Sequence, residues 1–213
     1  MHADIINAVA NFYHGRSSGA EAARSGTHDK QFLSLIGRQL VELGYEVHIS
    51  NGANDPEGAL AGHFRPAKSW DIIARRNGIP VIAIEFKGQV GSLGNNENNR
   101  YEESIGCAYD ARRRYGDRIC LGYLFVLGDD DEARRPNRAR RVVGIDPAWV
   151  QTSHAERREM FCERVTQDEF LYDATAVLYI KPDPNYADPD DPSLRFSSFV
   201  ARLHEVALAR GLY

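Results

Sequence analysis

Hydrophobic positions recur at two periods along the chain, and the alternation of these periods predicts a mixed α/β fold. Helices are predicted where apolar residues lie three and four positions apart, at about 29–43, 99–115, 153–166 and 194–210. Strands are predicted where short runs are apolar or alternate, at about 45–50, 69–76, 79–87, 119–127 and 175–181. Because strands and helices alternate, we expect a mixed central β-sheet flanked by helices on both faces.

The strongest local pattern is a pair of apolar runs, 69–76 and 79–87, on either side of Asn77-Gly78. Such a pair predicts a β-hairpin. Glu85 and Lys87 lie two residues apart on its second strand, so their side chains point to one face. The hairpin therefore presents a carboxylate and an ammonium side by side.

Whether Asp71 joins this pair depends on the turn. A two-residue turn would pair Asp71 with Ile84 and send it to the opposite face. A three-residue turn, Arg76-Asn77-Gly78, pairs Asp71 with Ala83 and leaves it diagonal to Glu85 on the same face. We predict this three-residue register, or an equivalent bulge. The opposite, buried face is then expected to carry five apolar side chains, Trp70, Ile72, Ile82, Ile84 and Phe86.

Charges on an otherwise apolar strand cost free energy unless they are paired or hold a metal. Asp71 and Glu85, with the Phe86 carbonyl, would offer Mg²⁺ the oxygen ligands that it prefers. Lys87 would orient the attacking water and neutralise charge on the phosphate, which suits in-line hydrolysis of a phosphodiester. The alternative is a partly buried salt bridge between Lys87 and either acid.

Composition bounds the class of protein. The 213 residues and their ordinary hydrophobic and charged fractions predict one globular domain, residues 1–213, with a mobile basic loop at about 128–141. A net charge of −4 argues mildly against a nonspecific nucleic-acid binder. The three cysteines are widely spaced and predict no disulfide framework or zinc site. We find no signal peptide or membrane span and expect a cytoplasmic protein.

Several polar residues outside the hairpin are candidates for DNA contact. Asn side chains suit adenine edges, and Arg suits guanine or phosphate. We expect the segment 94–99 to be a loop, followed by a helix that Asn99 caps with Glu102. Glu103 is expected to be solvated rather than to assist a metal-bound water, and His28 and Asp29 are weaker catalytic candidates. The DNA-binding candidates are Arg65, Lys68, Asn95, Asn96, Asn98, Asn99, Arg100 and, in the basic loop, Arg138.

At these residues the sequence resembles the PD-(D/E)XK nucleases, with an Asp, a gap and then Glu-x-Lys on a second strand. The sequence around this pattern resembles the XhoI-type restriction endonucleases more specifically. That likeness is strong over about 62–110, where the chain reads FRPAKSWD, then IEFK, then GNNENNR. It is patchier near Gly15-Arg16-Ser17-Ser18 and around 158–163. Trp70 stands where the motif's name has Pro.

The resemblance implies a restriction-endonuclease-like core and a prokaryotic, homodimeric type II enzyme that uses Mg²⁺. It implies cleavage of both strands of double-stranded DNA at a palindromic six-base site, CTCGAG, leaving 5′ overhangs, and a cognate DNA methyltransferase as functional partner. Asp71, Glu85 and Lys87 take the catalytic roles by motif position, with metal held at Asp71, Glu85 and Phe86. The alternatives are a repair or recombination nuclease of the same fold and a non-catalytic DNA-binding α/β domain.

Overall fold

A computed structural model describes residues 2–17, 29–52, 54–91, 93–136 and 144–213. Its centre is a six-stranded sheet in the order β1-β4-β5-β6-β7-β8. The two central pairings, β5 with β6 and β6 with β7, are parallel, and the others are antiparallel, so the sheet is mixed as predicted. The strands are β1 (Glu46–Ile49), β4 (Ile72–Arg76), β5 (Ile79–Gln89), β6 (Cys120–Gly128), β7 (Ala174–Lys181) and β8 (Asn185–Ala187).

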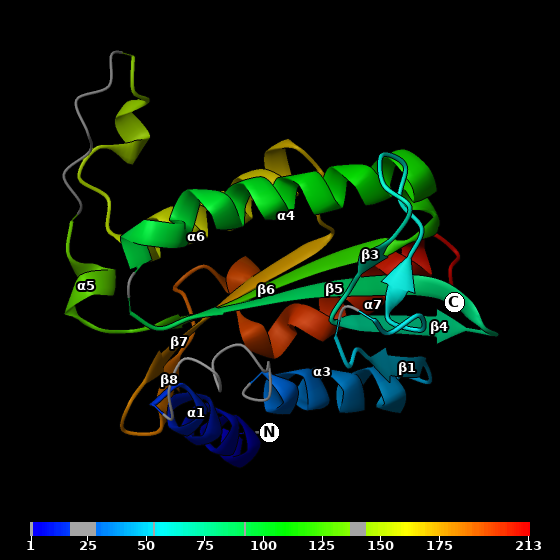
Figure 1. The fold of residues 1–213 in the computed structure, drawn as a ribbon, viewed down its shortest axis with the longest axis horizontal. Coiled ribbons are helices and arrows are strands. Elements are labelled where there is room, and N and C mark those ends of the chain that lie inside the picture. Colours follow the sequence, from blue (N-terminus) through cyan, green and yellow to red (C-terminus); the bar gives the residue numbers. More distant parts are fainter. Residues whose placement is uncertain (1, 18–28, 53, 92, 137–143) are drawn as a thin grey trace.

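Helices cover both faces of this sheet, in three layers (Figure 1). On one face lie α1 (His2–Ser17), α3 (Lys30–Glu42) and α7 (Phe196–Ala209). On the other lie α4 (Leu93–Tyr115) and α6 (His154–Glu163), while α5 (Asp131–Arg134) packs near α6. A two-stranded ribbon, β2 (Ala59–Leu60) with β3 (Lys68–Ser69), stands beside α4. Among the described residues, no helix is long and apolar enough to cross a lipid bilayer.

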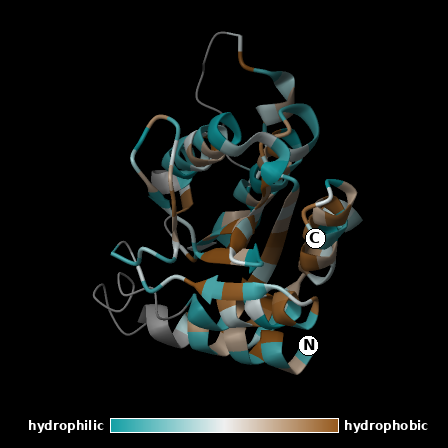
Figure 2. Cartoon of the chain, turned by 90° about the vertical axis from the view of Figure 1, so that its right-hand side faces the viewer, coloured by the Kyte–Doolittle hydropathy of each residue, from teal (hydrophilic) through white to brown (hydrophobic). Residues whose placement is uncertain are grey.

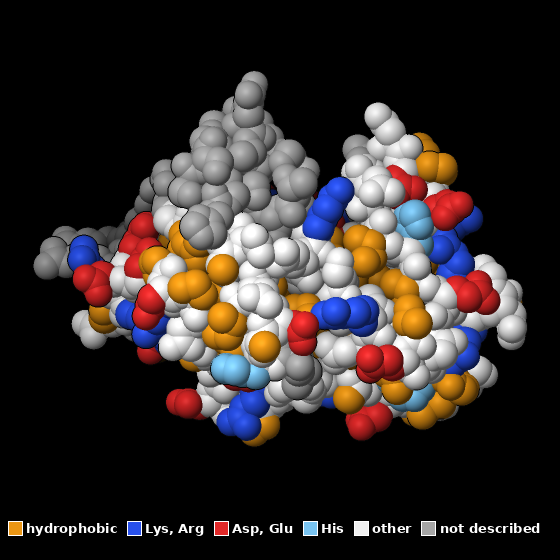
Figure 3. All heavy atoms as spheres, turned by 90° about the horizontal axis from the view of Figure 1, so that it is seen from below, with side chains coloured by type: hydrophobic (Ala, Val, Ile, Leu, Met, Phe, Trp, Pro, Cys, Tyr) orange, Lys and Arg blue, Asp and Glu red, His pale blue; other side chains and the backbone are white. Residues whose placement is uncertain are grey.

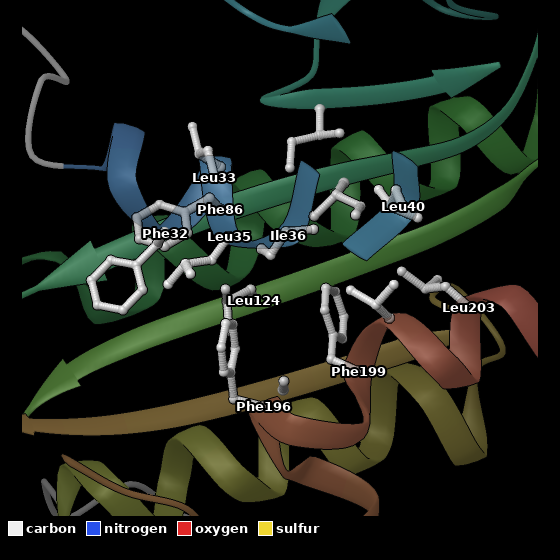
Figure 4. Packing of buried hydrophobic residues seen from close by; sticks show 14 of the residues in the cluster. Phe32, Leu33, Leu35, Ile36, Leu40, Phe86, Leu124, Phe196, Phe199 and Leu203 are labelled. Atoms are coloured by element: carbon white, nitrogen blue, oxygen red, sulfur yellow. The ribbon is translucent and has the colours of Figure 1, made fainter. Parts of the chain in front are cut away.

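Each face of the sheet has its own hydrophobic core. Under α3 and α7, Phe32, Leu40, Phe199 and Leu203 meet apolar residues of β5 and β6 (Figure 4). Apolar residues lie on the strands and the inward helix faces, with polar residues outside (Figure 2). On the face viewed from the side of α1 and α3, acidic and basic side chains are interspersed (Figure 3). Because a hydrophobic core covers each face, the sheet is buried on both sides, as expected for central parallel strands.

Two glycines let helices approach the central strands. A Cβ on Gly122 of β6 would lie 2.9 Å from side-chain atoms of both Leu203 and Phe199, so this glycine admits α7. A Cβ on Gly88 of β5 would lie 2.5 Å from the Phe12 ring of α1. The ring of Phe12 thus rests directly on the strand, one residue beyond Lys87.

The hairpin register differs in detail from the three-residue prediction. The turn has two residues, Asn77 and Gly78, both at positive φ (50° and 74°), as a tight hairpin turn requires. A β-bulge then shifts the register, because Ala74 pairs with Ile82 while Arg75 pairs with Pro80. Proline cannot donate to the ladder, and a bulge is where a strand tolerates it. The pairing of Asp71 with Ala83 is wrong, but the bulge alternative is found.

Two further expectations about the hairpin are also corrected. The predicted strand 69–76 is two strands, β3 and β4, separated by a bend at Asp71. Because of that bend, Trp70 does not face the core under α3. It packs instead with Ile73 and Ala83 in the core under α4, on the side of Glu85. The bend therefore places Trp70 on the face of the sheet that also carries Glu85.

The Asn-rich segment is not a loop. It forms the first turns of α4, which starts at Leu93, so the predicted helix start and capping box at Asn99 are wrong. The sequence patterns also missed α1, the strand β2 with its pairing to β3, and the edge strand β8. In the expected loop 128–141, α5 forms at Asp131–Arg134, whereas residues 137–143, including Arg138, lie outside the described residues.

Candidate active site

The structure brings Asp71, Glu85 and Lys87 together. Glu85 and Lys87 project from β5, and their neighbours across the parallel ladder are Tyr123 and Phe125. Asp71 lies at the bend before β4, where its N–H donates to the Ile84 carbonyl at 3.0 Å. Its Oδ2 accepts from the Phe86 N–H at 2.7 Å. Asp71 is therefore held to β5 by both its backbone and its side chain.

Glu85 is the most enclosed member of the group, with only 2% of its side chain exposed. One carboxylate oxygen contacts Nζ of Lys87, and the other accepts from Nζ of Lys68 at 2.8 Å. Burying a carboxylate is tolerated only when such partners compensate its charge. Both oxygens of Glu85 therefore face cations, one from its own strand and one from β3.

Burial and the neighbouring Glu85 both disfavour the charged form of Asp71. The pKa of Asp71 is raised to about 6, chiefly by burial and next by the nearby charge of Glu85. The Phe86 N–H and the ammonium groups of Lys87 and Lys68 oppose it. Like charges held this close are a property of sites that bind cations or carry out acid–base chemistry.

Lys87 remains a cation in these surroundings. Burial alone lowers the pKa of Lys87, but the charges of Glu85, Glu103 and Asp71 raise it more, so the net shift is upwards. A lysine with a raised pKa stays protonated at neutral pH and can donate hydrogen bonds but cannot act as a base. The site thus holds a fixed positive charge beside Glu85.

Glu103 of α4 joins the site from above the strand. Its carboxylate lies 3.3 Å from Nζ of Lys87 and 3.3 Å from Nη1 of Arg100. Burial raises the pKa of Glu103, but Lys87 and Arg100 outweigh it, and the net shift is downwards. Glu103 is exposed, as expected, but it is not only solvated, because its carboxylate also connects α4 to Lys87 of β5.

Asp110, which the sequence reasoning missed, fastens the loop that precedes β3. Its carboxylate accepts from the backbone N–H groups of His63 and Phe64 at 2.8 and 2.6 Å, and from Nε of Arg65 at 3.1 Å. A Cβ on Gly62 would lie 2.4 Å from the same carboxylate, so only glycine fits there. No local pattern reveals this anchor, since its partners lie 45–47 residues away.

The DNA-binding candidates are placed as follows. Arg65 is held by Asp110 and the Gly106 carbonyl, and Lys68 by Glu85, so both already have partners. Arg100 pairs with Glu103. The exposed candidates are Asn98 and Asn99 on α4; Asn95 and Asn96 lie on the same helix. Within the described part of the chain, no three His, Cys, Asp or Glu side chains group as metal ligands, so carbonyl and non-protein oxygens would be needed as well.

A mixed sheet between helix layers, with two acids and a lysine converging at an interrupted hairpin, is an arrangement that could hold a cation and act on a phosphodiester. The sequence model described as Restriction endonuclease XhoI matches residues 14–187. The chain belongs to this family of type II restriction endonucleases.

Curated relatives agree. The type II restriction enzyme BstVI of Geobacillus stearothermophilus is 30% identical over 179 residues, covering 77% of this chain and 79% of that protein. The type II restriction enzyme XhoI of Xanthomonas vasicola is 30% identical over 179 residues, covering 74% of this chain and 72% of that protein. A solved PspGI–substrate DNA complex is 13% identical with a TM-score of 0.40, covering 89% of this chain and 65% of that one, too distant to add to the assignment.

Proposed function

We propose that this restriction endonuclease hydrolyses both strands of double-stranded DNA with Mg²⁺, using Asp71, Glu85 and Lys87. The observation that carries the proposal is the joint placement of two acids and one lysine at the hairpin bend. Asp71 is bonded to the Phe86 N–H, and Glu85 is bonded to Lys87. A structural salt bridge already satisfies Glu85 through Lys87 and Lys68, whereas Asp71 is buried beside it with a raised pKa and is held by the Phe86 N–H rather than by an ammonium group.

The residues fit a hard divalent cation. Asp71 and Glu85 supply carboxylate oxygens whose mutual repulsion a cation would relieve. The N–H and carbonyl of one strand residue point to the same side, so the Phe86 carbonyl faces the edge at which its N–H meets Asp71. An all-oxygen set of this kind suits Mg²⁺. When bound, the metal supplies Lewis-acid polarisation of the phosphate and a water of lowered pKa.

The protein's own side chains would position the attacking water and stabilise the charge that develops on the phosphate. Lys87 stays protonated, so it orients the attacking water and neutralises charge that builds on the phosphate oxygens. Glu85 and Glu103 hold the Lys87 ammonium between β5 and α4. The attack is in line, and the 3′ oxygen leaves.

The family likeness supports the finer part of the proposal. We expect a homodimer acting at the palindrome CTCGAG with 5′ overhangs, and a methyltransferase that protects the same site. Candidates for DNA contact are Asn95, Asn96, Asn98, Asn99 and Arg100 on α4, Arg65 and Lys68 before the catalytic strand, and Arg138.

Digestion of plasmids of known sequence with Mg²⁺ tests the proposal. Discrete fragments whose ends map to CTCGAG are expected, and end sequencing reads the overhang. Cleavage into discrete fragments at another site would correct the specificity alone. A smear, or nicking that follows DNA structure rather than sequence, would favour a repair nuclease. Failure to cut any DNA with Mg²⁺ or Mn²⁺ would refute the catalytic assignment.

A further inference from the structure

Lys68 is the second cation of the active site, and the proposed function names it only as a candidate for DNA contact, with no role toward the metal. Its Nζ lies 2.8 Å from Oε2 of Glu85, and it also donates to the Ser69 carbonyl. Only 18% of its side chain is exposed, and its ammonium lies 5.5 Å from the centre of the Trp70 ring. Lys68 is therefore directed into the site and held there, unlike a solvated surface lysine.

The two lysines on Glu85 have different supports. Lys87 belongs to β5 of the main sheet, where Phe125 of β6 is its neighbour across the ladder, and its ammonium also contacts Glu103. Lys68 belongs to the two-residue strand β3, outside the main sheet, and reaches Glu85 through a long flexible side chain. Of the two ammonium groups, that of Lys68 can leave Glu85 without disturbing the catalytic strand.

Charge makes this departure necessary when a divalent cation binds. Asp71 and Glu85 bring two negative charges, and Lys68 and Lys87 already balance them. A divalent ion shared by the same two acids needs an oxygen of Glu85, and both oxygens are engaged by ammonium groups. Two added positive charges beside both ammonium groups would be strongly repelled at this depth of burial.

We propose that Lys68 is an internal counter-ion that takes the place of the divalent cation on Glu85 in the metal-free enzyme and is displaced from it when metal binds. This inference rests on the proposed metal-dependent function. It makes Lys68 a positioning residue that lowers the apparent metal affinity while it keeps Glu85 compensated before loading. Its role differs from that of Lys87, which keeps its contact with Glu85 throughout.

The test is metal binding to the full chain without DNA, by calorimetry and by the shift of Tm in a titration with Mg²⁺ or Mn²⁺. Lys68→Met is expected to bind metal about tenfold more tightly than wild type, because its competitor is gone. Without metal, its Tm is expected to be lower than that of wild type, and metal should restore it. Lys181→Met is the matched control: its ammonium lies 3.7 Å from Asp129, outside the site, and metal affinity should not change.

Lys68→Gln keeps the measurement possible if Lys68→Met does not fold, because the amide can still donate to Glu85 without a charge. It should also bind metal more tightly. Unchanged or weaker metal binding by the neutral variants would overturn the inference. Wild type that cuts DNA while Lys68→Gln gains no affinity would refute the counter-ion role alone. Wild type that cuts no DNA with either metal would refute the function instead.

Discussion

The backbone amide of Phe86 donates a hydrogen bond to Oδ2 of Asp71, at 2.7 Å, where the β4–β5 ladder has ended. A side chain thus replaces the next backbone acceptor of the hairpin. The bond holds one acid against the strand that carries the other, while the Phe86 ring packs on the far side of the sheet, 6.0 Å from the Phe32 ring (Figure 4). The spacing of the two acids is therefore set by strand geometry.

Asp71→Asn should remove a pH dependence from the stability of the metal-free protein. The pKa of Asp71 is raised from 3.8 to about 6, so between these values the folded state binds more protons than the unfolded chain. The free energy of unfolding therefore rises as pH falls from about 6 to about 4. Above about pH 6 the charged Asp71 lowers the free energy of unfolding. At neutral pH the variant should be more stable than wild type by about 1–3 kcal/mol.

Urea unfolding with a chelator present, at a series of pH values, measures this effect. The gain of Asp71→Asn over wild type should shrink as pH falls, and cleavage should be lost at every pH. A gain that does not vary between neutral and mildly acid pH would show that Asp71 titrates normally.

Lys87→Ala should slow cleavage about 10²–10³-fold while DNA binding persists. Loss of one donor aimed at developing charge costs about 10²–10³-fold in rate. Glu85 keeps Lys68 as a partner, so the variant should fold. Single-turnover cleavage and gel-shift binding of the same duplex separate the two effects. An undiminished rate would mean that Lys87 serves only as a salt-bridge partner.

Glu103→Gln should slow cleavage because it loosens the hold of α4 on Lys87. The pair is partly exposed, with 43% of the Glu103 side chain accessible, so its coupling is expected at about 0.2–1 kcal/mol, or up to about fivefold in rate. Glu102→Gln is the matched control, since Glu102 is exposed and has no ion pair within the described residues. Equal single-turnover rates for the two variants would argue that Glu103 does not position the lysine.

Asp110→Asn should destabilise the fold and impair the site indirectly. The substitution removes the negative charge of Asp110. That charge holds Arg65 and strengthens the hydrogen bonds from the N–H groups of His63 and Phe64. Weakening a buried, charge-assisted network of this kind costs about 1–3 kcal/mol. Asp117→Asn, whose side chain is 84% exposed, is the control and should leave Tm unchanged. If both variants melt like wild type, Asp110 does not anchor the loop.

Much of the sheet could be predicted because its signals are local. The apolar runs around Asn77-Gly78 predicted the hairpin, and the two-residue spacing of Glu85 and Lys87 put them on one face. Bringing Asp71 to that face required a choice of register, and the expectation of a bulge as one solution is confirmed. The bulge itself follows Pro80, a residue whose missing N–H favours such a site.

The rest depends on contacts that a local pattern does not contain. Asparagines are poor helix formers, so the segment 94–99 was predicted as a loop, yet it begins α4, where Glu97 is buried against His154 at 3.0 Å. Such tertiary packing overrides local propensity. Asp110 and Lys68 are likewise defined by partners distant in sequence, and neither could be assigned its contacts from the sequence alone.

The seat of Phe12 on Gly88 places a ring from α1 directly beneath the residue that follows Lys87. Deleting α1 would therefore leave a cavity beneath β5, although none of the described side chains of this helix contacts Asp71, Glu85 or Lys87. Fusion points and shortened versions of the enzyme should therefore leave α1 intact, because deleting this helix would remove the support beneath β5 and disturb the position of Lys87 relative to its acids.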